Sequence, residues 1–322
     1  MFTFRFLTTI AAALLLAMCC TSPACAKTPV ILDTDIGDDI DDTWALALLL
    51  RSPDLDVQLV TTTCGKAEYR AKIIARLLTV AGRSDVPVGL GEGGHSGTGG
   101  QQAWVEKYKL ADYAGKIQAD GAGAIIDLIE HSKDPVTVIA IGPLHTLAAA
   151  LDRRGSIAGK ASLAGMHGSV RKGYGGNAPD AEYNVKANVA AARKVLSAPW
   201  RQISITPLDT CGVVNLSGKR FETLKESRDP LARAVVENYR IWKNAKTADT
   251  IHASSTLFDT AAVYLAYPGS RPFMKLETLP ISVTADGFTR IDPAGTKMAV
   301  ATEWRDLDGF RDLLVERLCG QK

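Results

Sequence analysis

The sequence predicts a single α/β domain in which helices cover both faces of a mostly parallel central sheet. From Val30 onward, short apolar runs alternate with longer segments of helical periodicity, which is the pattern of such sheets. The 322 residues are 46% hydrophobic and 22% charged, an ordinary globular composition. Because no internal repeat or Pro- and Ser-rich linker interrupts the chain, we expect one domain over residues 27–322.

Local patterns predict the elements in chain order. Short apolar runs bounded by turn residues predict strands at residues 30–35, 57–63, 135–141 and 201–205. Longer segments with helical spacing of apolar residues predict helices at residues 43–50, 67–81, 144–151, 230–246, 255–267 and 307–318. The pair Asp286-Gly287 is a turn signal, which predicts a hairpin or meander over residues 279–301.

The first 26 residues carry the pattern of a secretory signal peptide. Arg5 precedes an apolar stretch over residues 9–18, and the small residues that follow end in Ala-Cys-Ala at residues 24–26. Signal peptidase accepts this A-x-A pattern. We therefore expect a mature chain that starts at Lys27 and is periplasmic or secreted.

A lipoprotein signal is the alternative for this segment, with Cys19 or Cys20 as the acylated residue. Met18, which precedes Cys19, is bulkier than the small residue usually found before such a cysteine. Nothing later in the chain reaches the roughly 20 consecutive apolar residues of a membrane-spanning helix. The sequence therefore predicts no membrane span.

Charge and cysteine content exclude two further classes. Lys and Arg total 37 against 35 Asp and Glu, so no positive excess favours nucleic acid as a partner. After signal cleavage the cysteines are Cys64, Cys211 and Cys319. Three cysteines allow at most one intramolecular bridge, which excludes a fold built on a disulfide framework.

The segment from Asp33 to Asp42 holds six carboxylates in ten residues. It lies between a predicted buried strand and a predicted buried helix, where a parallel sheet places its ligand crevice. Asp33 and Asp35 are two apart at a strand end and are expected to point to one side. Asp41 and Asp42 open the next helix, where carboxylates are favourable. We therefore expect a site here rather than a solvated acidic loop.

Carboxylates this close repel one another unless a cation or protons neutralise them. Oxygen ligands predict a hard ion, Ca²⁺ or Mg²⁺, and not zinc. The segment is not an EF-hand loop, because Gly37 and Asp38 occupy the fifth and sixth positions, and that loop needs glycine at the sixth. A haloacid-dehalogenase-type, Mg²⁺-dependent phosphatase, with Asp33 as nucleophile and Asp35 as acid, is an alternative, although that pattern wants Thr or Val at position 37.

Residues 30–46, with the sequence VILDTDIGDDIDDTWAL, resemble the amino-terminal signature of the calcium-dependent nucleoside hydrolases. The form here is the variant with two extra residues before the final Asp pair. Four further fragments resemble that family in the right order, at residues 61–65, 138–144, 177–184 and 257–259. The resemblance therefore extends over nearly all of the mature chain.

The resemblance implies hydrolysis of the N-glycosidic bond of ribonucleosides to free base and ribose. It implies a Ca²⁺ ion held by Asp35, Asp42, Asp259 and the backbone carbonyl of Ile141. Asp35 is then the general base that deprotonates a calcium-bound water, whose pKa the metal lowers. Asp33 supports the metal shell from behind.

The resemblance also implies a substrate-binding set and an assembly. The residues expected to grip the ribose are Asp41, Asn177, Glu182 and Asn184. Tyr239 lies where the family has aromatic residues that contact the base, and His252, seven residues before the late Asp, is expected to face the base as well. Asp39 belongs to the two extra residues, and its role is open. The family further implies a homodimer or homotetramer.

Two positions depart from the family pattern. Phe258 stands where many members have a His that protonates the leaving base, so the acid is another residue, such as His252, or base departure relies on activation of the sugar. Lys66 stands where many members have an Asn that contacts the ribose, which indicates a different 5′ side, such as a negative group. A periplasmic nucleoside- or sugar-binding protein without turnover is therefore a further alternative.

Overall fold

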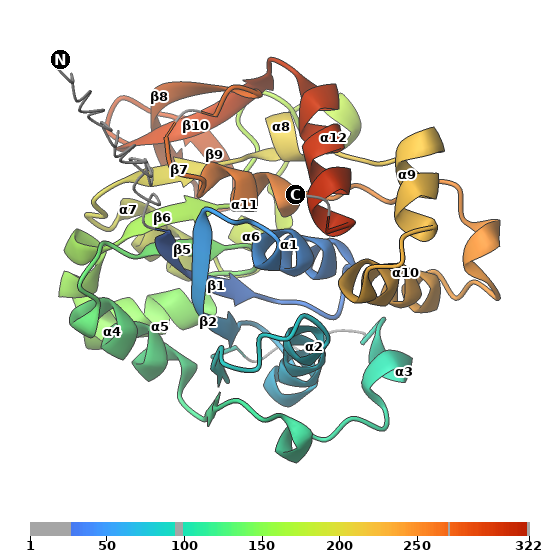
Figure 1. The fold of residues 1–322 in the computed structure, drawn as a ribbon. Helices are drawn as coiled ribbons and strands as arrows, with labels where there is room; N and C mark the ends of the chain where they lie inside the picture. Colours follow the sequence, from blue (N-terminus) through green and yellow to red (C-terminus); the bar gives the residue numbers. More distant parts are fainter. Residues whose placement is uncertain (1–26, 94–98, 270, 321–322) are drawn as a thin grey trace, which may run out of the picture.

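The computed structural model describes residues 27–93, 99–269 and 271–320. The predicted signal peptide over residues 1–26 lies outside the described residues. Within them, the chain forms one sheet with strand order β4-β3-β2-β1-β5-β6-β7-β10-β8-β9 (Figure 1). The strands are β1 Thr28–Thr34, β2 Leu55–Thr62, β3 Val88–Gly89, β4 Ile117–Gln118, β5 Thr137–Ala140, β6 Ser162–Gly165, β7 Ile203–Ile205, β8 Met274–Val283, β9 Thr289–Ile291 and β10 Thr296–Trp304.

Twelve α-helices and four short 3₁₀ turns connect these strands in the described part of the chain. The α-helices are α1 Asp41–Leu50, α2 Ala67–Val80, α3 Gln102–Val105, α4 Gly121–His131, α5 His145–Arg153, α6 Tyr183–Lys186, α7 Val189–Ser197, α8 Leu208–Cys211, α9 Gly218–Lys225, α10 Pro230–Trp242, α11 Thr260–Leu265 and α12 Leu307–Leu318. The 3₁₀ turns are η1 Leu110–Asp112, η2 Gly155–Lys160, η3 Tyr174–Gly176 and η4 Ala248–Thr250.

Strands β1 to β7 and β10 pair with one another in parallel. Strand β8 is antiparallel to both β10 and β9. The predicted single α/β domain with a mostly parallel sheet is therefore confirmed. The turn expected at Asp286-Gly287 joins β8 to β9, and Gly287 has the positive φ of 85° that the turn requires.

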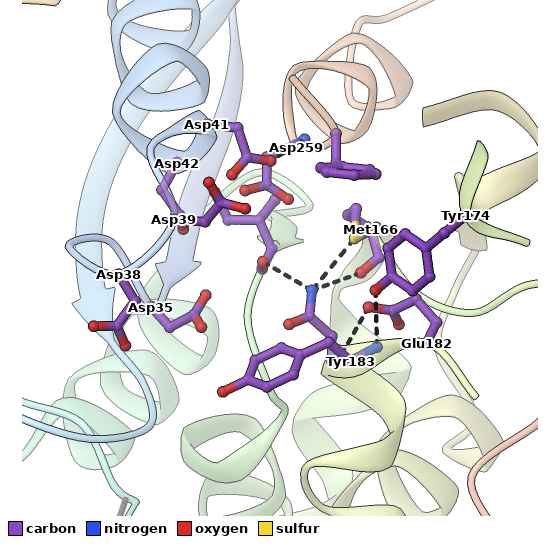
Figure 2. A pocket seen from close by; sticks show the side chains of 13 residues that line it. Asp35, Asp38, Asp39, Asp41, Asp42, Met166, Tyr174, Glu182, Tyr183 and Asp259 are labelled. Atoms are coloured by element: carbon purple, nitrogen blue, oxygen red, sulfur yellow. Dashed lines mark hydrogen bonds between the residues drawn. The ribbon is translucent and has the colours of Figure 1, made fainter. Parts of the chain in front are cut away.

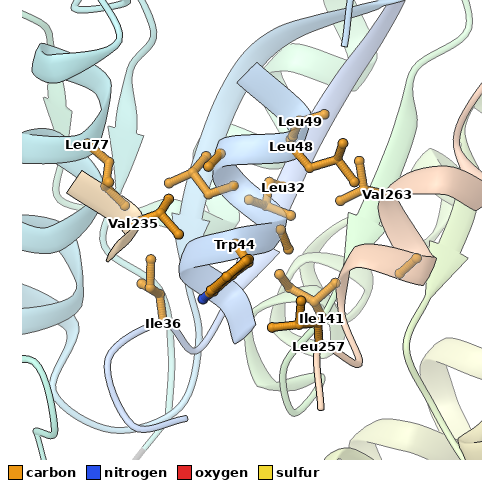
Figure 3. Packing of buried hydrophobic residues seen from close by; sticks show 14 of the residues in the cluster. Leu32, Ile36, Trp44, Leu48, Leu49, Leu77, Ile141, Val235, Leu257 and Val263 are labelled. Carbon is orange, nitrogen blue, oxygen red and sulfur yellow. The ribbon is translucent and has the colours of Figure 1, made fainter. Parts of the chain in front are cut away.

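Helices cover both faces of the sheet because successive residues of its central strand point to opposite sides. In β1, Val30 and Leu32 join one buried cluster together with α1, α2, α10 and α12, and Ile31 joins a second cluster with α4, α5 and α7. Trp44 of α1 lies in the first cluster (Figure 3). Its ring is stacked on that of Phe221, with ring centroids 6.5 Å apart. This two-sided burial holds β1 and α1 rigidly at the centre of the domain.

The order of the strands reverses at β1, which lies between β2 and β5. At their carboxyl ends, Asp33 pairs in register with Ala140, and the Ile141 amide donates to the Asp33 carbonyl at 2.9 Å. A parallel sheet opens a ligand crevice at such a switch point. The acidic segment follows β1 directly and therefore lies at this crevice.

Two predicted helices are shorter in the structure than the sequence indicated. The helix expected to reach residue 246 ends at Trp242, because Asn244 adopts a left-handed φ of 50° that terminates it. The helix expected from residue 255 begins at Thr260, because the preceding segment is extended: Ser254 and Leu257 donate their amides to the carbonyls of Leu216 and Val214.

No helix in the described ranges is long and apolar enough to cross a membrane. Cys64, Cys211 and Cys319 are all free, and the first two are buried. The fold of the described residues therefore depends on burial of apolar side chains and not on cross-links.

Candidate active site

A cavity of about 280 Å³ opens at the carboxyl ends of β1, β5 and β6 (Figure 2). Its lining combines carboxylates, one amide and a group of apolar and aromatic side chains. These residues are Asp35, Asp38, Asp39, Asp41, Asp42, Ile141, Met166, Tyr174, Glu182, Tyr183, Asn184, Phe258 and Asp259. The cavity thus collects segments that lie far apart in the sequence.

The acidic loop between β1 and α1 turns sharply at Gly37, whose φ is 119°. A side chain there would also collide with the ring of Tyr69, because an added Cβ would lie 2.6 Å from it. The loop is held from outside as well: Tyr69 donates its hydroxyl to the Gly37 carbonyl at 2.9 Å, and the Trp242 indole donates to the Asp38 carbonyl at 2.9 Å. These bonds fix the backbone that carries the acidic side chains.

Asp41, Asp42 and Asp259 form a compact carboxylate group, each offering an oxygen within 4.8 Å of the others (Figure 2). The first two begin α1, and Asp259 immediately precedes α11, so the amino-terminal ends of two helices stabilise the negative charge. The Asp259 amide donates to Asp41 Oδ2 at 3.2 Å, and the Thr34 hydroxyl donates to Asp42 Oδ1. The group is buried and tied to β1, α1 and α11.

Burial raises the pKa of every member of this group. The pKa of Asp41 rises to about 8, through burial and the charge of Asp39, and those of Asp42 and Asp259 rise well above their ordinary value through burial and neighbouring carboxylates. Such a group is ionised at neutral pH only if positive charge offsets it. The all-oxygen donor set fits a hard divalent cation such as Ca²⁺ or Mg²⁺.

This group differs from the ligand set expected from the sequence. Asp41, expected to bind substrate, belongs to this group, and Asp35, expected to be a ligand, lines the same cavity beside it. Burial raises the pKa of Asp35 to about 6, and the charge of Arg70 is the largest effect in the opposite direction. The Ile141 carbonyl, also expected to be a ligand, accepts a hydrogen bond from Asn184 Nδ2 at 3.1 Å.

Glu182 and Asn184 are both buried and face the carboxylate group across the cavity. Glu182 accepts the Gly168 amide at 2.9 Å on one oxygen and the Asn184 amide at 2.7 Å on the other. Asn184 donates from Nδ2 to the Met166 carbonyl at 3.1 Å as well as to Ile141. Burial raises the pKa of Glu182 to about 7. Both side chains are thereby fixed in orientation at the cavity wall.

Asp33 and Asp39 differ in burial: Asp33 is buried beneath the cavity lining, and Asp39 is exposed. Asp33 is fully buried and does not line the cavity; its Oδ1 accepts from the Thr61 hydroxyl at 2.6 Å. This position disfavours Asp33 as the nucleophile of a phosphatase, because substrate in the cavity does not reach it. Asp39 lines the cavity as an exposed residue, and its Oδ1 accepts from the Ile40 amide at 2.7 Å.

Three residues expected to bind substrate do not line the cavity. His252 has a side chain 79% exposed, 4.0 Å from Glu222, because the extended segment before α11 carries it to the surface. Tyr239 is buried in the core against Trp44, with ring centroids 5.8 Å apart. Asn177 is exposed and donates from Nδ2 to the Tyr174 carbonyl at 2.9 Å, because the glycine-rich turn folds back on itself.

The aromatic wall of the cavity was not foreseen as such. Tyr174 and Phe258 meet edge to face, with ring centroids 6.1 Å apart, and Tyr183 is 51% exposed at the cavity. The sequence singled out Phe258 only as a departure from the family pattern. Tyr174 was not predicted to line the cavity, because the glycine-rich segment around it resembles a flexible connector. Lys66, the other departure, is exposed, immediately precedes α2 and does not line the cavity.

Comparison with known proteins identifies relatives over nearly the whole described chain. Residues 30–310 match the family described as inosine-uridine preferring nucleoside hydrolase. A non-specific ribonucleoside hydrolase of Klebsiella pneumoniae is 33% identical over 234 residues, which cover 66% of this chain and 73% of that protein. An uncharacterised protein of Schizosaccharomyces pombe is 26% identical over 314 residues, covering 90% of this chain and 98% of its own.

Solved structures share the fold. A plant nucleoside hydrolase superposes with a TM-score of 0.73 at 25% identity, covering 90% of this chain and 98% of that one. An inosine-uridine preferring nucleoside hydrolase from Bacillus anthracis superposes with a TM-score of 0.72 at 19% identity, covering 90% and 99%. With the family match extending from β1 to the first turn of α12, this chain belongs to the inosine-uridine preferring nucleoside hydrolase family.

Proposed function

We propose that this protein hydrolyses the N-glycosidic bond of ribonucleosides and releases free base and ribose. The observation that carries the proposal is the buried Asp41, Asp42 and Asp259 group, which shares one cavity with Asp35 and Glu182. Family membership supports it, as do relatives such as the ribonucleoside hydrolase of Klebsiella pneumoniae.

The carboxylates suit the transition state of this reaction. Glycosidic bonds break through an oxocarbenium-like sugar, so a surrounding negative field stabilises the charge that develops on the ribose. Asp35 accepts the proton of the attacking water, and its pKa of about 6 places it close to the pH at which a general base works well. Glu182 and the Oδ1 atom of Asn184 accept hydrogen bonds from the sugar hydroxyls, and both side chains are held in fixed positions by their other hydrogen bonds.

The ion in this proposal is Ca²⁺, held by Asp41, Asp42 and Asp259, with the Ile141 carbonyl at the same cavity wall. When bound, it supplies positive charge that neutralises the buried carboxylates, binds sugar hydroxyls and lowers the pKa of a water. Asp33 lies behind this group and supports the end of β1 through Thr61.

The aromatic wall is assigned to the base. Tyr174, Tyr183 and Phe258 offer flat apolar surfaces, which suit a planar heterocycle. These contacts do not depend on the pattern of polar groups on the base, so purine and pyrimidine nucleosides are both candidate substrates.

Two further elements of the proposal concern the whole protein. The chain is exported, with cleavage before Lys27, and works in the periplasm or outside the cell. It assembles as a homodimer or homotetramer, which size-exclusion chromatography with light scattering would measure.

The experiment uses the chain from Lys27 onward and measures base and ribose release from a panel of purine and pyrimidine ribonucleosides, with added calcium and after chelation. Release that chelation abolishes supports the proposal, and the panel ranks the substrates. Because Phe258 occupies the cavity wall, a binding protein without turnover is the second candidate. Binding of a nucleoside by calorimetry with no release of base would establish that candidate instead.

A further inference from the structure

Arg70 is a fully buried cation directly behind the acidic loop. It lies in the first turn of α2, and its side chain is only 2% exposed. None of the described residues that line the cavity is Lys, Arg or His. Arg70 contacts two of the lining residues, through the Asp35 carbonyl and the Asp38 carboxylate. A charge in this position requires a full set of partners.

The guanidinium joins two loops that follow neighbouring strands. Its Nε donates to the Cys64 carbonyl at 2.5 Å, in the loop after β2. Its Nη1 donates to the carbonyls of Asp35 and, at 2.8 Å, Ile36, and its Nη2 donates to Asp38 Oδ2 at 2.8 Å, all in the loop after β1. Four acceptors in fixed directions match the planar fork of arginine and not the single ammonium of lysine.

These hydrogen bonds fix the backbone at Asp35, which is the general base in the proposed function. The Asp35 carbonyl and the Ile36 carbonyl both point to Arg70, which leaves the Asp35 side chain to face the cavity. The carboxylate group of Asp41, Asp42 and Asp259 depends on other elements, because it is built on the beginnings of α1 and α11. Loss of Arg70 therefore affects the Asp35 end of the cavity first.

We propose that Arg70 is a positioning residue, which holds the loop from Asp35 to Asp38 so that the Asp35 carboxylate is presented to the substrate. The proposal rests on the proposed function for its catalytic consequence only. Its structural part, that the guanidinium fork orders this loop, stands independently of any activity.

The test compares Arg70→Ala and Arg70→Lys with Arg76→Ala. Arg76 lies on the same helix, and its guanidinium is 4.3 Å from the centre of the Trp104 ring, with no contact to the acidic loop. We expect kcat of Arg70→Ala to fall by about 10²-fold and that of Arg70→Lys by about tenfold, with KM within about threefold of the unchanged protein. Added methylguanidinium should recover part of the kcat of Arg70→Ala. Arg76→Ala should keep both constants.

Hydrogen exchange measured by mass spectrometry supplies the readout that needs no substrate. Peptides covering residues 33–42 should exchange faster in both Arg70 variants and not in Arg76→Ala. Three results would overturn the proposal. They are hydrogen exchange of residues 33–42 equal to that of the unchanged protein, a loss of kcat/KM that comes from a higher KM in the Arg70 variants, and an unchanged kcat in Arg70→Lys. If the unchanged protein releases no base at all, the proposed function fails, and hydrogen exchange alone decides the positioning role.

If neither Arg70 variant folds, Asp38→Asn tests the same contact from its more accessible side. Asp38 accepts from Arg70 and, at 3.1 Å, from the Gly99 amide, and its side chain is 25% exposed. The variant should speed exchange of residues 33–42 to a smaller extent than loss of Arg70. Exchange equal to that of the unchanged protein would overturn the proposal.

Discussion

The Asp259 amide donates a hydrogen bond to Asp41 Oδ2 at 3.2 Å, which joins residues 218 positions apart in the chain. This contact brings the amino-terminal ends of α1 and α11 together and assigns Asp41 to the carboxylate group. The family resemblance implied Asp35 as the ligand beside Asp42 and Asp259, and Asp35 lines the same cavity. The contributions of Asp41 and Asp35 to calcium binding can be measured directly in variants of each residue.

Asp41→Asn is expected to weaken calcium binding by at least about 10²-fold, because it removes a charge from the group itself. Asp35→Asn is the matched change outside the group and should weaken calcium binding less than Asp41→Asn does. Isothermal titration calorimetry on both variants measures the two affinities. An equal or larger loss in Asp35→Asn would return Asp35 to the ligand set.

Asp35→Asn is expected to lower kcat by about 10²-fold or more, because the amide cannot accept a proton from water. Steady-state kinetics with a nucleoside that the unchanged protein hydrolyses would measure the effect. Retention of most of the activity would reject Asp35 as the general base.

Without calcium, the stability of the protein is expected to fall as the pH rises from about 5 to 8. Burial raises the pKa of Asp35 from 3.8 to about 6, that of Glu182 from 4.5 to about 7 and that of Asp41 from 3.8 to about 8 in the folded state. Their protonated forms therefore favour the folded state at low pH, and this contribution is lost as each group ionises. Melting temperatures in a chelator at several pH values would show the slope.

Two controls accompany that measurement. Glu182→Gln removes one of the titrating groups and should flatten the slope above pH 6, and added calcium should flatten it further, because the ion favours the ionised carboxylates. A melting temperature that rises between pH 5 and pH 8 in the chelator would contradict the assignment.

His252→Ala is expected to leave kcat and KM within about twofold of the unchanged protein, because a substitution at an exposed site away from the cavity is close to neutral. Steady-state kinetics on this variant tests whether the sequence pattern or the structure places the residue correctly. A loss of kcat above about tenfold would restore His252 as an acid for the leaving base.

The sequence predicted those parts of the site that depend on local pattern. The apolar run before Asp33 and the helix after Asp42 were predicted from periodicity, and a parallel sheet has its crevice where these two elements meet. Glu182 and Asn184 were expected at the same site, and the structure brings both to the cavity wall.

The remaining features depend on tertiary contacts that no local pattern shows. The residues before Asp259 have helical composition, but pairing with Val214 and Leu216 keeps them extended and directs His252 to the surface. Arg70 resembles any other polar residue of an amphipathic helix, because its partners are backbone carbonyls of distant loops. Sequence spacing alone does not reveal such contacts.

Helix α1 limits how far the carboxylate group of Asp41, Asp42 and Asp259 can contract. Nine of its ten residues are buried, including Asp41 and Asp42, so the helix cannot shift toward Asp259 without disturbing the apolar core. Magnesium needs six oxygens at about 2.0–2.1 Å in a strict octahedron, whereas calcium accepts irregular shells at about 2.3–2.6 Å. If the carboxylate group cannot contract to the smaller radius, we expect it to bind calcium more tightly than magnesium, which calorimetry with each ion would measure.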